Sequence, residues 1–442
     1  MTYANAMQQP PQSNTALRAA VLLALTIVAS PGRAQTTAPQ PASAPTAAEA
    51  QRAETIESIT VTATRRREPV RDVPLRVETL GAADIERQGA ASLTDTIGAL
   101  PGVNVDTGGG PGRGAITIRG GSPGPQAIAT VGVYLDDVAF GSSSAFALGA
   151  TSALDMALLD LHHIELLRGP QGTLYGAGAM GGLLKYVTNE PDSTLFSGKV
   201  GLGVRSVKGG KLSHTENVVL NVPLSQNVAA VRVAAFNDHD GGYIKAVGRV
   251  PGDHVNDGNT QGARVSALIE PTNKLKVRLS AVTQEIHRNN TNIVDYNLAT
   301  GQPVYGELTR NRAYAEPYTI KTSLTSADAE YDFGWARLNA IASTQRFDRS
   351  STQDASRLAP VFDYIAIDST AKVQKDTEEL RLTSQPGALE WLVGYYRNKE
   401  ISLVTQRAFA NGAPTGGVET TLQGNRQPSE YREQAEIGRA HV

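Results

Sequence analysis

Residues 164–176 read IELLRGPQGTLYG, and residues 183–188 read LLKYVT. The first stretch is an apolar run of strand length that ends at Arg168, where glycine and proline interrupt regular structure. The second stretch reads as another strand. Two apolar strands separated by a glycine-rich loop predict a compact domain built from short elements.

Short elements of the same kind extend outward, from about residue 67 to residue 189. A helix is predicted from the cap residue Ser92 to a stop at Pro101-Gly102. The glycine-rich segments 108–114 and 120–125 are predicted to be loops. Further strands are predicted over residues 115–119 and 131–135. Nothing in this region is large enough for a big catalytic core.

Beyond this domain the pattern changes to alternation with a period of two. Val200, Leu202 and Val204, for example, alternate with lysine, glycine and arginine. Such alternation is typical of a transmembrane barrel strand, which turns apolar side chains to lipid and polar or small ones inward. About nine strands are indicated, over residues 200–204, 218–222, 231–235, 265–269, 275–281, 318–325, 334–342, 378–384 and 389–397.

The lengths of the connections also favour a barrel. Short predicted turns alternate with long polar loops, of which the longest cover residues 237–261, 284–317 and 346–375. Barrels of the outer membrane have short periplasmic turns and longer extracellular loops. A soluble β-sandwich or propeller is the alternative, and it accommodates loops of this length poorly.

The amino-terminal residues have the organisation of a secretory signal peptide. Arg18 precedes the apolar run 19–29, and small residues precede a cleavage site after Ala34. Residues 35–58, rich in alanine, proline, threonine and glutamine, are predicted to form a flexible linker. The ITVTA segment at 59–63 has strand spacing and suits either pairing with another protein's sheet edge or the first strand of the next domain.

Composition excludes several classes of function. With 41 basic and 43 acidic residues the formal net charge is −2, and without a basic patch we expect no nucleic-acid partner. The chain has no cysteine, which excludes disulfides and a thiolate nucleophile. A G-x-G-x-x-G pattern at 176–181 is followed by a strand instead of the helix that a dinucleotide site requires, and the adjacent His162 and His163 lack further metal ligands. We therefore expect no enzyme activity, no metal and no cofactor.

Five spaced motifs together resemble the plug of TonB-dependent outer-membrane receptors. They are ITVTA at 59–63, LPGV at 100–103, IRG at 118–120, VYLDDV at 133–138 and IELLRGPQGTLYG at 164–176. The resemblance implies an all-β membrane β-barrel, 22-stranded in the family, with an N-terminal α+β plug domain in its lumen. It divides the chain into a signal peptide (1–34), a linker (35–58), a TonB box (59–63), a plug (64–190) and the N-terminal part of the barrel (191–435).

About nine strands cannot close such a barrel, and an open edge in lipid leaves backbone groups unpaired. We therefore expect the chain to be C-terminally truncated, with a non-native tail at residues 436–442.

The resemblance also implies a function. We expect TonB-dependent active transport of a scarce bulky solute, in the first place a ferric siderophore or other iron complex, across the outer membrane of a Gram-negative bacterium. Uptake of cobalamin or an oligosaccharide, or a passive porin, are the alternatives. The implied partners are TonB in the inner-membrane energy-transducing complex, outer-membrane lipid and a small-molecule ligand such as an iron chelate.

Roles for individual residues follow from the same resemblance. TonB is expected to bind Ile59, Thr60, Val61, Thr62 and Ala63. An ionic lock to glutamates of the barrel wall, with Glu379 as a candidate, is expected to use Arg119 and Arg168. Contacts to the substrate are expected from Gly110, Arg113, Ser143 and Phe146. The run Arg65-Arg66-Arg67, by contrast, is predicted to be a solvated charge run beside the plug.

Overall fold

The structure is a computed structural model that describes residues 60–62, 65–66, 68–73, 76–88, 96–98, 100–121, 127–151, 159–176, 178–356, 364–411 and 419–441. The expected signal peptide and linker lie outside the described residues, as do Ile59 and Ala63 of the expected TonB box.

The plug is a small mixed domain built on a five-stranded sheet in the order β3-β8-β9-β6-β7. These strands are β3 (Val77–Gly81), β6 (Val131–Leu135), β7 (Val138–Phe140), β8 (Leu161–Arg168) and β9 (Gly182–Thr188). Two small ladders pair β1 (Thr60–Val61) with β2 (Glu68–Pro69) and β4 (Val103–Asp106) with β5 (Ala115–Ile118). The helical elements are η1 (Val70–Asp72), α3 (Ala82–Gln88), η2 (Ala145–Ala147), η3 (Gly149–Thr151) and α5 (Gly172–Tyr175).

The strands predicted in the plug are confirmed, and the helix predicted from Ser92 is described only at Thr96 and Ile97. β8 and β9 are buried along almost their whole length because the plug covers both of their faces. Leu166 and Leu184 belong to one buried cluster, whereas their neighbours Leu167 and Leu183 belong to another.

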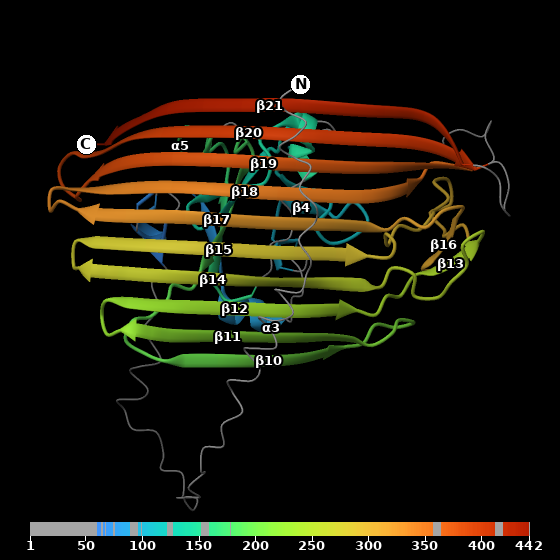
Figure 1. The fold of residues 1–442 in the computed structure, drawn as a ribbon, viewed down its shortest axis with the longest axis horizontal. Coiled ribbons are helices and arrows are strands. Elements are labelled where there is room, and N and C mark those ends of the chain that lie inside the picture. The colour runs from blue at the N-terminus through green and yellow to red at the C-terminus, as the bar shows by residue number, and fades with distance from the viewer. Residues whose placement is uncertain are drawn as a thin grey trace, which may run out of the picture.

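The described strands from Ser197 onward, apart from the separate pair β13 and β16, form one antiparallel ten-stranded sheet whose strands follow in chain order (Figure 1). It contains all nine predicted strands and a tenth, β21, that was not predicted. The strands are β10 (Ser197–Arg205), β11 (Ser213–Ser225), β12 (Ala229–Asp240), β14 (Gly258–Thr272), β15 (Leu275–Arg288), β17 (Tyr318–Asp332), β18 (Ala336–Asp354), β19 (Ile365–Ser384), β20 (Glu390–Asn411) and β21 (Glu419–His441).

Side chains on these strands alternate as the sequence predicted. Val200, Leu202 and Val204 on β10 are 58%, 82% and 72% exposed, on the face that a barrel turns to lipid. Intervening residues point to the plug: Lys199 reaches Glu86 of α3, and Arg232 of β12 reaches Asp160. The sheet is therefore a barrel wall around the plug.

Most of the strands are longer than predicted, so the loops are shorter. The connection between β12 and β14 covers residues 241–257, because the backbone ladder continues into polar sequence beyond the apolar band. Long connections gather at one end of the sheet, where β13 (Lys245–Gly248) and β16 (Thr309–Arg312) pair, and short turns lie at the other end (Figure 1). Residues 436–441 pair with β20 as part of β21, and their expected non-native origin stays a prediction.

Among the described residues, no helix has both the length and the apolar character needed to cross a bilayer.

Candidate functional site

The segment that resembles a TonB box is docked on the plug. Val61 is fully buried, while Thr60 is exposed beside it. Thr62 donates its backbone N–H to Glu165 Oε1 at 3.0 Å and receives a hydrogen bond from Lys185 Nζ at 2.6 Å. The Tyr175 hydroxyl donates to the Thr62 carbonyl oxygen at 3.2 Å. These hydrogen bonds converge on Thr62, next to the buried Val61.

Glu165 is the acceptor at the centre of this attachment, and its side chain is fully buried. Burial by itself would raise its pKa, but hydrogen bonds from His163 and Thr62 and the charge of Lys185 outweigh burial and lower the pKa. The carboxylate therefore stays ionised and accepts strong, charge-assisted hydrogen bonds. His162 and His163 contact each other through their Nδ1 atoms, and the described residues contain no group of three or more metal-ligating side chains.

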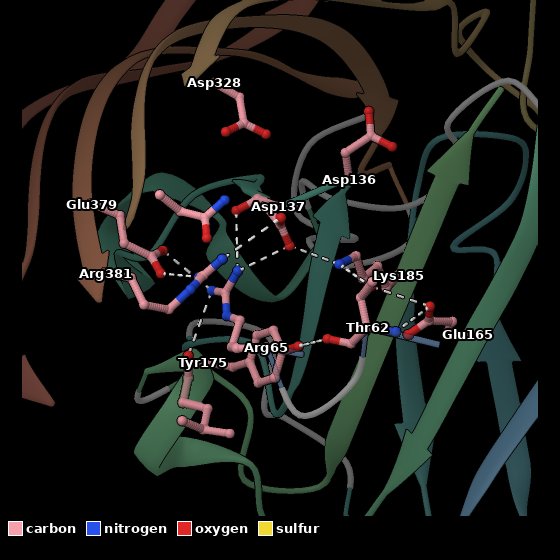
Figure 2. A network of polar contacts seen from close by, with 12 residues as sticks. Thr62, Arg65, Asp136, Asp137, Glu165, Tyr175, Lys185, Asp328, Glu379 and Arg381 are labelled. Atoms are coloured by element: carbon pink, nitrogen blue, oxygen red, sulfur yellow. Dashed lines mark hydrogen bonds and ion pairs between the residues drawn. The ribbon is translucent and has the colours of Figure 1, made fainter. Parts of the chain in front are cut away.

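An ion cluster of five residues joins the plug to the barrel wall (Figure 2). Its members, from here the plug–barrel cluster, are Arg65, Asp137 and Lys185 of the plug and Glu379 and Arg381 of β19. Arg65 lies 3.3 Å from both Asp137 and Glu379, and Lys185 lies 2.7 Å from Asp137. Arg381 pairs with Glu379 at 2.5 Å. Because Lys185 also holds Thr62, the box segment and the barrel wall share one network.

Arg65 corrects a prediction, because it is not a solvated residue. It is 7% exposed and lies over the rings of Tyr134 and Tyr175, with its Cζ 4.3 Å from the Tyr175 ring centroid. The Arg65 N–H donates to the Thr62 carbonyl oxygen at 2.9 Å, which holds Arg65 beside the docked Thr62. Arg66 also reaches the barrel, 3.3 Å from Glu390, while Arg67 lies outside the described residues.

Asp137 is the charge on which the cluster depends. Burial would raise its pKa, but Lys185, Arg381 and Arg65 outweigh burial and hold the pKa well below its ordinary value. Two of these cations come from the plug and one from the wall. The ionised carboxylate therefore bridges the two domains.

A second connection has the opposite polarity, since a plug carboxylate meets barrel arginines. The Asp160 carboxylate accepts two hydrogen bonds from Arg232 of β12, at 2.8 and 2.6 Å, and one from Arg264 of β14, at 2.6 Å. Arg264 also donates to the Asp160 carbonyl oxygen at 2.9 Å. Asn189 also donates to the carboxylate, at 2.9 Å. The Asp160 side chain is 3% exposed. We call this group the Asp160 clamp.

A third connection holds the plug loop at 141–144 against β19 and β20. The Ser143 N–H donates to Glu400 at 2.8 Å, and its hydroxyl receives hydrogen bonds from Lys375 and Asn398 at 3.1 and 3.2 Å. Ser142 donates to the same Glu400 at 2.5 Å. Ser143, expected to contact the substrate, is thus occupied by barrel side chains, and its contact with substrate stays a prediction.

The two arginines of the expected ionic lock lie elsewhere. Arg168 pairs with Glu78 of the plug at 2.6 Å. Arg119 is exposed, and it forms no ion pair with any residue in the described ranges. Glu379, named as their candidate partner, instead pairs with Arg65. A role for Arg119 and Arg168 in holding the plug to the wall stays a prediction.

The remaining predicted substrate residues lie on the side of the plug that faces the long loops. Gly110 packs so closely on Tyr318 of β17 that a Cβ there would overlap its hydroxyl oxygen. Arg113 lies over the same ring, with its Cζ 5.0 Å from the centroid. Phe146 is 61% exposed in η2. Contact of these three with a substrate also stays a prediction.

A cavity of about 1090 Å³ separates the plug from the wall on the side of the box. Residues that line it include Thr60, Thr62, Asp136, Lys185, Arg278 and Trp391. It is therefore bordered by both the docked segment and the plug–barrel cluster.

Sequence reasoning missed Glu165, Lys185 and Asp160. For the first two a signal was present, because each interrupts an apolar strand in which an ionised side chain must find a partner. Asp160 carried no comparable signal, because its barrel partners are more than 70 residues away in sequence.

Comparisons with known proteins agree with this geometry. The TonB-dependent Receptor Plug Domain family matches residues 69–183. The vitamin B12 transporter BtuB of Vibrio vulnificus (strain CMCP6) is 25% identical over 315 residues, which are 62% of this chain and 50% of that protein. The pesticin receptor of Yersinia enterocolitica is 34% identical over 116 residues, which are 26% of this chain and 16% of the receptor.

The crystal structure of the ferric yersiniabactin uptake receptor FyuA from Yersinia pestis has the same fold, with a TM-score of 0.64 at 18% identity. The likeness covers 83% of this chain and 61% of FyuA. The chain thus spans about half the length of the B12 transporter that it matches. Proteins of this family are transport receptors. Residues 69–183 thus form the plug domain of a TonB-dependent receptor, and the ten described strands around it have the fold of the barrel wall of these outer-membrane proteins.

Proposed function

We propose that this chain forms the plug and part of the barrel of an active importer, which takes up a scarce bulky solute with energy delivered by TonB. The proposed solute is a ferric siderophore or another iron complex. The observation that carries the proposal is the docking of Thr62, which links the box segment through Lys185 to the plug–barrel cluster. A pull on the segment would load that cluster directly.

The energy has to arrive mechanically, because an outer membrane with open porins holds no ion gradient. The linker at 35–58 would give the box segment a reach of roughly 80 Å when fully extended. TonB would bind the segment by adding a strand to it, a mode in which backbone hydrogen bonds supply the affinity. Residues 59–63 have the strand spacing that this mode requires.

The proposal is tested by Val61→Pro in the receptor expressed in outer membranes. Proline removes the N–H of Val61 and so disrupts strand pairing with a partner. We expect energised uptake of a ⁵⁵Fe-labelled chelate to fall to background, while binding of the chelate at the cell surface is unchanged. Thr60→Ser is the control, because Thr60 is exposed and serine keeps both its hydroxyl and its N–H. Uptake that survives Val61→Pro would favour a passive porin.

Cobalamin is a second candidate, favoured by the B12 transporter of Vibrio vulnificus, which matches across 62% of this chain. Competition distinguishes the two. If cobalamin displaces the labelled iron chelate and is itself taken up with TonB, the iron assignment fails but TonB-dependent transport stands.

A further inference from the structure

Two arginine side chains lie near each other where the plug loop at 108–114 packs on β17, on the side of the long loops. Arg113 belongs to the plug loop at 108–114, and Arg349 lies on β18 directly opposite Ile320 of β17. Arg349 is two residues beyond the buried Phe347, which packs on Ile320 and Tyr318, so strand alternation turns both side chains into the lumen. Gly112, the neighbour of Arg113, packs on Ile320, and Arg113 lies over Tyr318 on the same face of β17, so the two arginines are near neighbours with like charge.

Neither arginine has an acidic partner in the part of the chain that the structure describes. No ion pair or side-chain hydrogen bond joins Arg113 or Arg349 to a described residue, and the Nε atom of Arg113 is buried without an acceptor. The acid that acts most strongly on Arg113 is Glu316, which already pairs with Arg310 and lies 3.8 Å from Arg312.

The surroundings hold Arg113 in a fixed orientation. Tyr318 is 2% exposed, its hydroxyl donates to the Pro111 carbonyl oxygen at 3.1 Å, and its ring lies under the guanidinium. A guanidinium stacked on a ring directs its N–H groups sideways in its own plane. The donors of Arg113 are therefore directed past the edge of the Tyr318 ring.

Two half-buried like charges without a counter-ion are costly, so such an arrangement is retained where a ligand completes it. Guanidinium groups match carboxylate and phosphate oxygens in a two-point geometry. We propose that Arg113 and Arg349 bind an oxyanion group of the solute, so that the cargo is a metal chelate of net negative charge. The identification of the ligand as cargo rests on the transport function proposed above.

The test measures binding to the purified receptor in detergent by calorimetry. The probes are ferric citrate as an anionic chelate, ferrichrome as a neutral one and ferrioxamine B as a cationic one. We expect ferric citrate to bind best, and Arg349→Gln and Arg113→Gln each to weaken it about 10- to 100-fold, as expected for loss of a hydrogen bond to a charged group. Arg349→Lys keeps the charge and should lose less.

Arg346→Gln is the matched control, because Arg346 is exposed on the opposite face of the same strand. It should leave the affinity unchanged. Loss of Arg349 should not destabilise the ligand-free receptor, which separates a binding role from a structural one. Failure of ferric citrate to bind, or equal affinities in the glutamine variants and the parent, would overturn the inference. Since binding is measured without energy, uptake that fails although binding depends on the arginines would count against the transport proposal alone.

Discussion

Asp160→Asn should release one side of the plug from the barrel. The substitution keeps the shape of the side chain, and asparagine tolerates the positive φ of 57° at this position. It removes the charge that faces Arg232 and Arg264, which are 17% and 11% exposed in their side chains. Two barrel arginines would then be left largely buried without a counter-ion.

The expected cost follows from that burial. Removing one partner of a buried ion pair costs about 3–5 kcal/mol, and we take about 3 because lumen water reaches both arginines. At about 1.4 kcal/mol per tenfold change, local opening around β8 should become roughly 100-fold more frequent. A companion change, Arg264→Gln in the Asp160→Asn background, should recover part of the loss because it removes one unpaired charge.

Hydrogen exchange measured by mass spectrometry on the membrane-inserted receptor reads this opening directly. Peptides that cover Leu161–Arg168 should exchange faster in Asp160→Asn, and small-solute leakage through the receptor should rise. Asp348→Asn, on the exposed outer face of β18, is the control and should change neither. Exchange of β8 within threefold of the parent, with the barrel intact, would refute the reasoning, since about 3 kcal/mol predicts a far larger effect.

Three further predictions concern the box segment and the plug. Glu379→Gln leaves the buried Arg65 without its barrel partner, which should loosen the box segment. A spin label on Thr60→Cys, which would be the only thiol in the chain, should therefore become more mobile, and unchanged spectra would contradict this. The pKa of Asp137 is depressed in the folded plug, so its stabilisation is complete above about pH 4, the unfolded value, and is lost as the pH falls through the lower folded value. Leakage should therefore rise on acidification in the parent but depend less on pH in Asp137→Asn. Gly114→Ala, at a φ of 91° where an added Cβ would overlap a backbone carbonyl oxygen, should destabilise the 108–114 loop, and faster exchange of that loop is the measurement.

Part of the fold and of the site could be predicted from local sequence patterns. The strands at 131–135 and 164–167 follow from apolar runs bounded by glycine and proline, and the barrel strands follow from alternation at period two. The box segment at 59–63 was predicted from two local features, its strand spacing and its position directly after a linker. The prediction that Arg65 is solvated was wrong. A local run of charges does not indicate which of its side chains the folded protein will bury.

The amino-acid sequence alone determined the plug and the direction of the barrel side chains, and it supplied the proposal that residues 59–63 bind TonB, since each depends on neighbours in the chain. Only the tertiary structure decided which charges meet. Arg65 pairs with Glu379, Asp160 pairs with Arg232 and Arg264, and Arg113 stacks on Tyr318, all across more than 70 positions. The physical reason is that barrel strands present one inward side chain every second residue, so the register between strands and the seating of the plug select the pairs.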